Sequence, residues 1–505
     1  MIAAVAANRP LHALLAGALL VPAFAPFNLW PLLLIALLLL SHLWWRAASA
    51  REAALIGWFA GCGLFGAGVS WVWVVIHQFG GSGLMVATLL TLLFVALLAL
   101  YLALLGLLLG AIRPHLTAAT WWLLLLPAGW ILIEWLRSHL FTGFPWLLIG
   151  YSQLDGPLAG YAPIIGVLGI GWLLLLTVGG IGWALSTRRR TRAASAPTAA
   201  LLLTLLLIWG AGPPLQQIAW SEPAGAPLPV ALLQGNVPQE SKWDPNTAQL
   251  RLDRYAKLSE AQFGRAALIL WPENAITLFH HQIDLVYLQP LAAAAAAAGS
   301  ELLLGLPVLT ADGNGYYTSM VVPGEQSHFY HKHHLVPFGE YLPFASLLRG
   351  LIAFFDLPMS GFSPGSAQQP PLPIAGQLAA VTICYEDAFA ATNRSVMAAA
   401  TLLVNGSNNA WFGDSLAPHQ HLQIARMRAL ESRRPLLRAT TNGISALVDH
   451  RGQLIARSPQ FATATVVGEV VPQRGLTPWL RWGDGPLLLL LLLSLLPCGV
   501  GVIRA

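Results

Sequence analysis

A cysteine stands at the end of a predicted buried strand. Residues 378–387 read LAAVTICYED, so Cys384 follows an apolar run and precedes two acidic side chains. Free cysteine is among the most buried residue types, and this stretch alone is explained more simply by a small buried hydrophobe. Two other residues favour chemistry instead. Glu273 follows another apolar strand in LILWPENAI, and Lys332 lies in FYHKHHLVPFGEY.

A carboxylate, an ammonium group and a thiol together suit acyl transfer in two steps. A thiolate attacks a carbonyl readily and later departs readily, provided that a base takes its proton and a cation lowers its pKa. Glu273 is the candidate base, and Lys332 is the candidate that stabilises the oxyanion, assisted by a backbone N–H after Cys384. The simpler alternatives are a surface carboxylate and a solvated lysine. Lysine is rare here, with three in 505 residues, which weakens the second of these alternatives.

The composition indicates a protein that is partly embedded in a membrane. Hydrophobic residues make up 56% of the chain and charged residues 10%, against about 25% charged residues in an average soluble domain. Residues 1–217 hold nine arginines, no lysine and three acids. This uneven charge predicts a membrane domain over 1–217, a water-facing domain over 218–485 and a closing membrane helix over 486–505. The net charge of +5 comes partly from arginines at membrane boundaries, so we expect no nucleic-acid binding.

Eight apolar segments are predicted as transmembrane helices, each of which needs about 20 apolar residues. They lie at about 10–26, 28–46, 53–76, 83–112, 118–137, 162–186, 198–214 and 486–503. Prolines interrupt the first two segments, so a helical hairpin is an alternative to two full spans. The apolar loop 138–161 is too interrupted to span, and it either packs between helices or lies along the outer interface of the bilayer. Glu134 and Arg137, three residues apart, are a candidate structural pair.

Arginines predict the orientation, because cytoplasmic loops are enriched in them. They precede the first span and then occupy alternate loops, at Arg9, Arg46, Arg51, Arg113 and the run 188–192. The chain is therefore predicted to start inside, with residues 218–485 on the non-cytoplasmic side. Cys62 and Cys498 lie in predicted spans, which leaves Cys384 unpaired in the exported part. Such a thiol is either reactive or paired with another molecule.

The water-facing part is predicted to be an α/β domain. Apolar runs predict strands at 230–237, 267–271, 301–308, 316–322, 376–383, 401–405, 436–440 and 444–449. Helices are predicted at 246–263, 285–298 and 419–434. Pro290 either kinks the second helix or marks its start. Apolar strands separated by helices indicate a largely buried sheet.

The histidines around Lys332 raise the question of a metal site. His331, His333 and His334 would be spread over both faces of a strand, and no acid or cysteine completes a ligand set. The sequence contains no paired CxxC, no HExxH and no GxxxxGK motif. We therefore expect neither a metal nor a cofactor.

The motifs WPENA, YHKHHLVPFGEY and TICYED resemble the Glu-Lys-Cys pattern of the nitrilase superfamily. The order of seven leading spans, one exported nitrilase-like domain and one closing span is similar to the apolipoprotein N-acyltransferase family of bacterial membranes. The stretches QGNVPQESKWD, LVPFGEYLP, SNNAWFGDS and RMRALESRRPLLRATTNGISA also resemble that family, so the likeness covers nearly the whole chain. One departure is Asn409, where the resemblance leads us to expect an aspartate.

The resemblance implies an αββα sandwich over 228–470, with Cys384 as nucleophile, Glu273 as general base and Lys332 as stabiliser of the oxyanion and the substrate. It also implies a supporting carboxylate and residues that line or brace the site: Glu340, Tyr385, Glu386, Trp243, Asn408 and Trp411. The implied reaction moves a fatty acyl chain from a phospholipid, commonly phosphatidylethanolamine, to the α-amino group of a lipoprotein's N-terminal diacylglyceryl-cysteine. The acyl group waits as a thioester on Cys384. The implied location is the bacterial inner membrane, with the catalytic domain of a monomer on the periplasmic face.

Two other functions fit parts of the sequence. A membrane-tethered amidase that hydrolyses small amides would use the same three residues, but one span would suffice to anchor it. A transporter or scaffold with a degenerate domain would have lost one of the three. An enzyme for two lipid substrates must work at the bilayer surface, because each buried CH₂ is worth about 0.8 kcal/mol. The apolar stretch 347–362 is therefore predicted to be a membrane-dipping lid, with a core helix as the equal alternative.

Overall fold

The computed structural model describes residues 8–187, 196–341, 343 and 361–503. Two expected features lie outside these residues, namely the arginine run 188–192 and nearly all of the candidate lid 347–362. The chain forms two compact units. The first comprises Met1–Trp73, Gly83–Ile218 and Trp482–Ala505, and the second comprises Val74–Ser82 and Ala219–Arg481.

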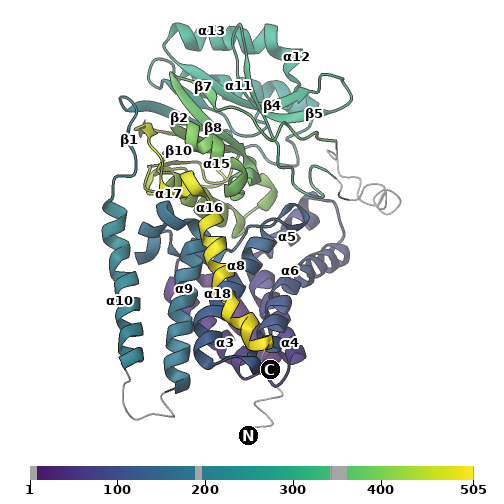
Figure 1. Cartoon of the computed structure of the whole chain (residues 1–505). Coiled ribbons are helices and arrows are strands. Elements are labelled where there is room, and N and C mark those ends of the chain that lie inside the picture. The colour runs from purple at the N-terminus through teal and green to yellow at the C-terminus, as the bar shows by residue number, and fades with distance from the viewer. Residues whose placement is uncertain (1–7, 188–195, 342, 344–360, 504–505) are drawn as a thin grey trace. The chain divides into compact units, whose positions relative to one another are not determined.

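The first unit consists of apolar helices (Figure 1). They are α2 (Arg9–Ala18), η1 (Val21–Ala23), α3 (Trp30–Trp45), α4 (Ala50–Gly68), α5 (Trp71–Val74), α6 (Leu84–Ile112), η3 (Arg113–His115), α7 (Ala118–Thr120), η4 (Trp121–Leu125), α8 (Leu126–Arg137), α9 (Ala162–Thr187), α10 (Ala196–Gln217) and α18 (Gly485–Ile503). Every predicted apolar segment thus contains helix.

The predicted number of about eight transmembrane helices is not confirmed. Among the described residues, four helices are long and apolar enough to cross a membrane, over Leu84–His115, Ala118–Arg137, Pro157–Ser186 and Ala199–Gln217. The helices Ala50–Gly68 and Trp71–Phe79 meet at a bend of 55° and add a fifth span if the pair is counted as one. The apolar helices Arg9–Ala23 and Trp30–Trp45 are shorter, below the length of about 20 residues that a full span needs.

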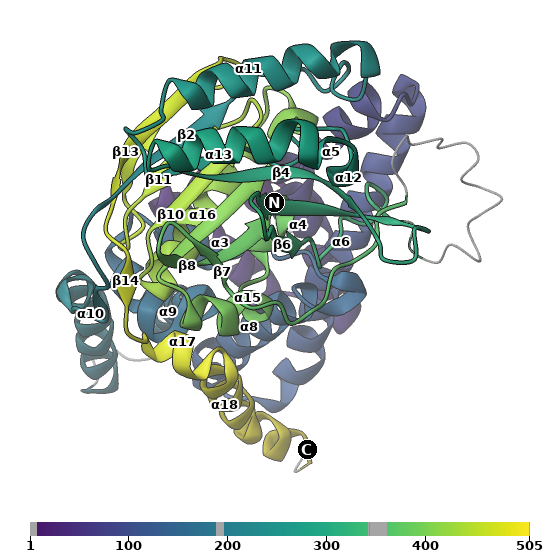
Figure 2. The ribbon, with the colours of Figure 1, turned by 90° about the horizontal axis from the view of Figure 1, so that it is seen from above.

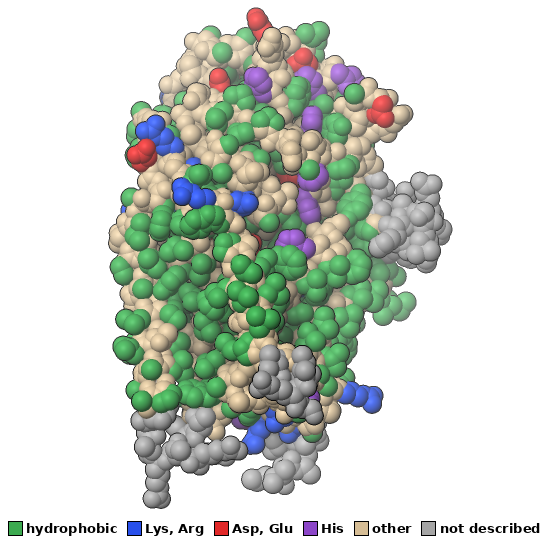
Figure 3. Space-filling view, viewed as in Figure 1, with side chains coloured by type: hydrophobic (Ala, Val, Ile, Leu, Met, Phe, Trp, Pro, Cys, Tyr) green, Lys and Arg blue, Asp and Glu red, His purple; other side chains and the backbone are tan. Residues whose placement is uncertain are grey.

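Leucines project outward from these helices. Leu92 and Leu97 of α6 and Leu206 and Leu207 of α10 are each more than half exposed. On the face drawn in Figure 3, hydrophobic side chains cover most of the surface that these helices form. Contiguous apolar surface of this extent is unusual in a soluble monomer and is expected of helices that face lipid. It indicates a membrane protein.

The loop 138–161 is short helical turns rather than extended chain: η5 (Leu140–Thr142), η6 (Ile149–Gln153) and η7 (Pro157–Tyr161). Two buried charged residues of α8 hold it. Glu134 Oε1 accepts from the Ile149 N–H at 3.0 Å, and Arg137 donates to the carbonyl oxygens of Phe144 and Trp146, both at 2.6 Å. These bonds agree with packing against the helices as the role of the loop.

The second unit contains two six-stranded sheets and a two-stranded ribbon. One sheet has the order β13 (Ala464–Val470), β2 (Leu228–Gln234), β3 (Leu268–Leu270), β4 (Glu301–Leu309), β5 (Tyr316–Val322) and β6 (His328–His331). The other has the order β12 (Leu454–Arg457), β11 (Ala446–Val448), β10 (Leu436–Thr440), β9 (Leu402–Ser407), β8 (Gln377–Ile383) and β7 (Leu372–Ile374). The ribbon pairs β1 (Glu222–Pro223) with β14 (Gln473–Arg474).

The alternation of side chains along the central strands explains the layers. In β2, Val230 joins the core between the sheets, whereas Ala231 joins the core beneath the outer helices. In β9, Val404 faces the core between the sheets and Leu403 faces outward. Four helices cover the outer faces: α11 (Ala248–Glu260), α13 (Gln289–Ala297), α15 (Ala390–Ala399) and α16 (Ala417–Ser432). Figure 2 shows α11 and α13 side by side over the first sheet. The predicted αββα layering is present.

All eight predicted strands overlap observed ones, and the three predicted helices overlap α11, α13 and α16. Pro290 is the second residue of α13, so it marks the start of this helix, which the π-helical turn η9 (Asp284–Leu288) precedes. The prediction missed β1, β6, β7, β12, β13, β14 and α15, and also the short helices α12 (His280–Ile283) and α17 (Pro478–Trp482). β6 and β12 are short edge strands with few buried side chains, and they lack the apolar run on which the prediction depended.

Candidate active site

The strand directions bring the candidate residues to one edge of the sheets. β2, β3 and β4 run parallel, and β6 has the same direction because two antiparallel pairings separate it from β4. Glu273 follows β3, and Lys332 follows β6. In the other sheet β8 and β9 are parallel, and Cys384 and Asn408 follow them directly. The carboxyl ends of parallel strands are the usual place for a site in such sheets.

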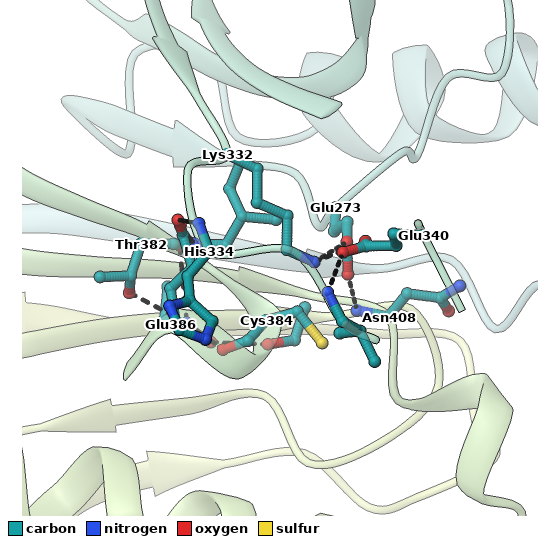
Figure 4. A network of polar contacts seen from close by, with 12 residues as sticks. Glu273, Lys332, His334, Glu340, Thr382, Cys384, Glu386 and Asn408 are labelled. Atoms are coloured by element: carbon teal, nitrogen blue, oxygen red, sulfur yellow. Dashed lines mark hydrogen bonds and ion pairs between the residues drawn. The ribbon is translucent and has the colours of Figure 1, made fainter. Parts of the chain in front are cut away.

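Lys332 joins two carboxylates. Its Nζ lies 3.2 Å from Glu273 Oε1 and 2.7 Å from Glu340 Oε1. Glu340 Oε2 in turn accepts from the Val336 N–H at 2.8 Å. Figure 4 shows Lys332 and both carboxylates gathered on one side of the Cys384 side chain. The ammonium group is therefore held between the candidate base Glu273 and the supporting carboxylate Glu340, beside the candidate nucleophile.

Burial and neighbouring charges set the protonation states. Burial lowers the pKa of Lys332, but Glu273 and Glu340 outweigh it, so this pKa lies well above its usual value. Burial raises the pKa of Glu340 although Lys332 opposes the change. Burial and the charge of Glu273 raise the pKa of the Cys384 thiol, and Lys332 only partly offsets them. The resting group at neutral pH is therefore a thiol, whose attack on a carbonyl needs a base.

Glu273 is held at both its side chain and its main chain. Its Oε2 accepts from the Asn408 N–H at 2.7 Å. Lys242 Nζ donates to the Glu273 carbonyl oxygen at 3.1 Å. Gly305 of β4 packs on the same turn, and a Cβ at this position would lie 2.1 Å from the Pro272 oxygen and 2.8 Å from the Glu273 Cα. Only glycine fits this close approach of two main-chain segments.

We expect Gly305→Ala to destabilise the second unit and to lower activity together. The new methyl group would overlap main-chain atoms, which cannot rotate away, and such overpacking costs about 1–3 kcal/mol. Thermal unfolding and activity of the purified variant should be measured beside Gly324→Ala, because Gly324 has its nearest neighbour atom 3.9 Å from the added Cβ. Equal unfolding temperatures for the two variants would contradict the expectation.

Cys384 has a left-handed backbone, with φ 53°, at the start of the 3-10 turn η10 (Cys384–Ala388). This conformation costs a non-glycine residue about 1–2 kcal/mol, and the bonds of Glu386 support it. Glu386 Oε2 accepts from the Ile383 N–H at 2.7 Å. Its Oε1 accepts from the N–H groups of the two residues after Lys332, at 2.7 and 2.9 Å. Glu386 therefore joins the turn that carries Cys384 to the segment that carries Lys332.

A second buried polar network, which the sequence prediction missed, lies at the main chain of Cys384. Its carbonyl oxygen accepts from His421 Nε2 at 3.1 Å and from Asn405 Nδ2 at 3.2 Å. Asp387 bonds both His421, at 2.9 Å, and Arg438, at 2.9 Å. Burial and the nearby Arg438 lower the pKa of His421, so the ring is neutral at neutral pH. One signal was present in the sequence, because Arg438 is a charge inside the apolar strand LLRAT.

The remaining predicted residues differ in whether they contact the candidate catalytic residues. Trp411 Nε1 lies 3.2 Å from the side-chain amide of Asn408, whose N–H holds the candidate base. The Tyr385 ring packs edge-on against a neighbouring phenylalanine at 4.8 Å between centroids. Trp243 is partly exposed and directly follows the buried Lys242. The roles of Trp243 and Tyr385 stay predictions.

A segment that lies between α5 and α6 in the sequence belongs to the second unit and includes the π-helical turn η2 (Val75–Phe79). The Phe79 ring meets the Trp411 ring edge-on, with centroids 5.9 Å apart. Val74 lies 3.3 Å from the position that a Cβ of Gly413 would occupy. Trp411 is therefore braced on one side by η2 while its indole reaches Asn408.

The histidines beside Lys332 are engaged with protein groups. His331 Nδ1 lies 2.7 Å from Ser319 Oγ, and His333 Nδ1 lies 2.8 Å from the carbonyl oxygen of Gly365. In the part of the chain that the structure describes, no group of three or more His, Cys, Asp or Glu side chains could hold a metal ion.

The chain resembles known proteins along nearly its whole length. Residues 16–180 match the family "Apolipoprotein N-acyltransferase N-terminal domain", and residues 229–475 match the family "Carbon-nitrogen hydrolase". An apolipoprotein N-acyltransferase of Methylococcus capsulatus is 42% identical over 478 residues, which cover 94% of this chain and 93% of that protein. One of Azotobacter vinelandii is 44% identical over 480 residues, which cover 94% and 92%.

Among solved structures, a carbon-nitrogen hydrolase from Helicobacter pylori G27 aligns with 48% of this chain and 89% of its own, at 17% identity and a TM-score of 0.37. The two sequence relatives establish the family of the chain, since both exceed 40% identity over more than nine-tenths of each chain. This protein belongs to the apolipoprotein N-acyltransferase family.

Proposed function

We propose that the protein transfers a fatty acyl chain from a membrane phospholipid of the phosphatidylethanolamine class to the N-terminal α-amino group of a diacylglyceryl lipoprotein, through a thioester on Cys384. The observation that carries the proposal is the contact of Lys332 with both Glu273 and Glu340 beside a buried thiol. Membership in the family and the apolar helices of the first unit support the choice of lipid substrates.

In the first half-reaction Cys384 Sγ attacks the ester carbonyl of the phospholipid while Glu273 takes the thiol proton. The concerted transfer follows from the raised pKa of the thiol. The oxyanion that forms is stabilised by the buried ammonium group of Lys332. The intermediate then collapses, the carbon–oxygen ester bond breaks, and Glu273 returns the proton to the departing glycerol oxygen. A lysophospholipid leaves, and the acyl group stays on Cys384.

In the second half-reaction the α-amino group of the lipoprotein attacks the thioester carbonyl. Glu273 takes a proton from the attacking nitrogen, and Lys332 again stabilises the oxyanion. The carbon–sulfur bond breaks, an amide bond has formed, and Cys384 recovers its proton from Glu273. The cycle consumes one ester and one amine and needs neither an oxidant nor a cofactor. Glu340 keeps Lys332 in place through both steps, because it binds the same ammonium group.

The alternative of a small-amide hydrolase would use the same residues, with water in place of the amine. The relatives do not favour it, since they carry the acyltransferase name over the full chain and not over the second unit alone. The two functions differ in a simple assay. The purified protein should convert a diacylated lipopeptide to an N-acylated one only when phospholipid is supplied, as the mass of the lipopeptide would show. Release of free fatty acid without any N-acylated product would support the hydrolase instead.

We further propose that the protein resides in the bacterial inner membrane with residues 218–485 on the periplasmic face. The arginine distribution of the first unit supports this orientation. A phosphatase reporter joined near residue 230 should then be active, because such a reporter folds only outside the cytoplasm. The same reporter joined in the loop near Arg113 should be inactive. Activity of the second fusion and not the first would reverse the proposed orientation.

A further inference from the structure

The chain contains three lysines, and two of them are buried in the same site. Lys257 is exposed on α11, whereas Lys332 and Lys242 are each 1% exposed. A buried ammonium group is costly unless protein groups replace its water. The proposed mechanism accounts for Lys332 but gives no role to Lys242, which lies in the loop after β2.

Lys242 contacts the candidate base Glu273 directly and also acts on it through Asn408. Its Nζ donates to the main-chain oxygen of Glu273 at 3.1 Å. The same Nζ lies 3.1 Å from a side-chain amide atom of Asn408, which accepts when that atom is the oxygen. The Asn408 N–H donates to Glu273 Oε2 at 2.7 Å. Lys242 therefore fixes both the main chain of Glu273 and the residue that orients its carboxylate.

The positive charge of Lys242 lies close enough to Glu273 and Cys384 to affect them electrostatically. Among the described residues it forms no ion pair, whereas Lys332 is paired with two carboxylates. Burial lowers the pKa of Lys242 to about 8, against the effect of Glu273. The other charged or titratable groups that face it are Arg251, which lowers this pKa, and Cys384, which raises it. Lys242 is therefore mainly protonated at neutral pH and loses its charge as the pH rises through about 8.

We propose that Lys242 is a positioning residue for the general base, which holds Glu273 in line with the Cys384 thiol and adds positive charge as negative charge develops in the site. This inference rests on the proposed function and deepens it. It predicts that Lys242 acts on the formation of the acyl-enzyme more than on the binding of phospholipid, since its contacts are with Glu273 and Asn408.

Lys242→Met, Lys242→Gln and the matched control Lys257→Met test the inference in the full-length protein. The rate of acyl-enzyme formation should be followed by intact mass after mixing with phosphatidylethanolamine vesicles between pH 6 and pH 10. We expect Lys242→Met to slow this step by between about 10-fold and 100-fold at a nearly unchanged KM, because small misplacements of catalytic groups cost this much. Lys257→Met should match the wild type.

The pH profile separates a positioning role from a merely structural one. The wild type and Lys257→Met should lose activity as the pH rises through about 8, and this loss should be absent from both Lys242 variants. Lys242→Gln keeps an N–H donor without the charge, so its rate should lie between those of Lys242→Met and the wild type. It also serves as the test if Lys242→Met fails to fold.

Three outcomes would be decisive. An acylation rate for Lys242→Gln within about twofold of Lys257→Met would overturn the inference. So would a wild-type loss of activity near pH 8 that persists unchanged in the Lys242 variants. If the wild type and Lys257→Met form no acyl-enzyme at all, the proposed function itself fails, and the two failures are thereby distinguished.

Discussion

We expect Cys384→Ala to abolish acyl transfer, with a loss of at least about 10⁴-fold in kcat, because loss of the proposed covalent nucleophile removes the whole two-step route. The structure makes this expectation specific. Cys384 is 8% exposed, its carbonyl oxygen is bonded by His421 and Asn405, and its backbone is held in a left-handed conformation. The two hydrogen bonds hold the main chain of Cys384 in this turn. Alanine keeps the backbone contacts and removes only the sulfur.

The matched control is Cys62→Ala, which removes a thiol from α4 in the other unit. Activity should be measured as the N-acylation of a diacylated lipopeptide in phospholipid vesicles. Cys62→Ala should retain wild-type activity. If Cys384→Ala retained more than about one-tenth of the wild-type rate, the nucleophile would have to be another group.

Glu273→Gln is expected to lower kcat by about 10²-fold to 10⁴-fold, the usual contribution of a general base. Glutamine has nearly the same shape, and its oxygen can still accept from the Asn408 N–H. It cannot take the proton of a thiol whose pKa is raised by burial and by Glu273 itself. The variant loses one of the charges that raise this pKa, so the thiol should ionise more readily than in the wild type.

The lower pKa of the thiol in Glu273→Gln gives a second measurable effect, which is a changed dependence of activity on pH. Glu273→Gln should recover part of its activity as the pH rises, because hydroxide then does the work of the base. Glu325→Gln, at an exposed turn, is the control and should show the wild-type rate and profile. A Glu273→Gln variant within tenfold of this control at neutral pH would argue against Glu273 as the base.

The positions of the candidate site residues were largely predictable, because two of them follow strands. Glu273 and Cys384 each end an apolar run, and parallel strands bring their carboxyl ends to one edge. Lys332 was predictable only from its rarity and from the resemblance, since β6 is too short and too polar to be recognised as a strand. Its partner Glu340 lies in a loop, where the sequence has no hydrophobic periodicity from which its position could be predicted.

The residues that the sequence analysis missed share one physical property. Each is a polar side chain that is buried and bonded to groups far away in the sequence. Lys242 stands in the loop SKWD, whose composition predicts only a solvated turn, yet its Nζ reaches the main chain of Glu273. Arg438 and His421 meet Asp387 only after β10 and α16 have packed. The number of about eight spanning helices was not confirmed, because the described helices Arg9–Ala23 and Trp30–Trp45 are shorter than the apolar segments predicted at those places.

The central claim is that the acyl chain resides on Cys384 between two half-reactions. The most direct measurement is the intact mass of the wild-type protein after incubation with phosphatidylethanolamine vesicles and no acceptor. We predict a mass increase of one fatty acyl group, which neutral hydroxylamine removes as expected of a thioester and which a diacylated lipopeptide also discharges. An unchanged mass under conditions in which N-acylated lipopeptide still forms would contradict a covalent intermediate and would require direct transfer between the two lipids.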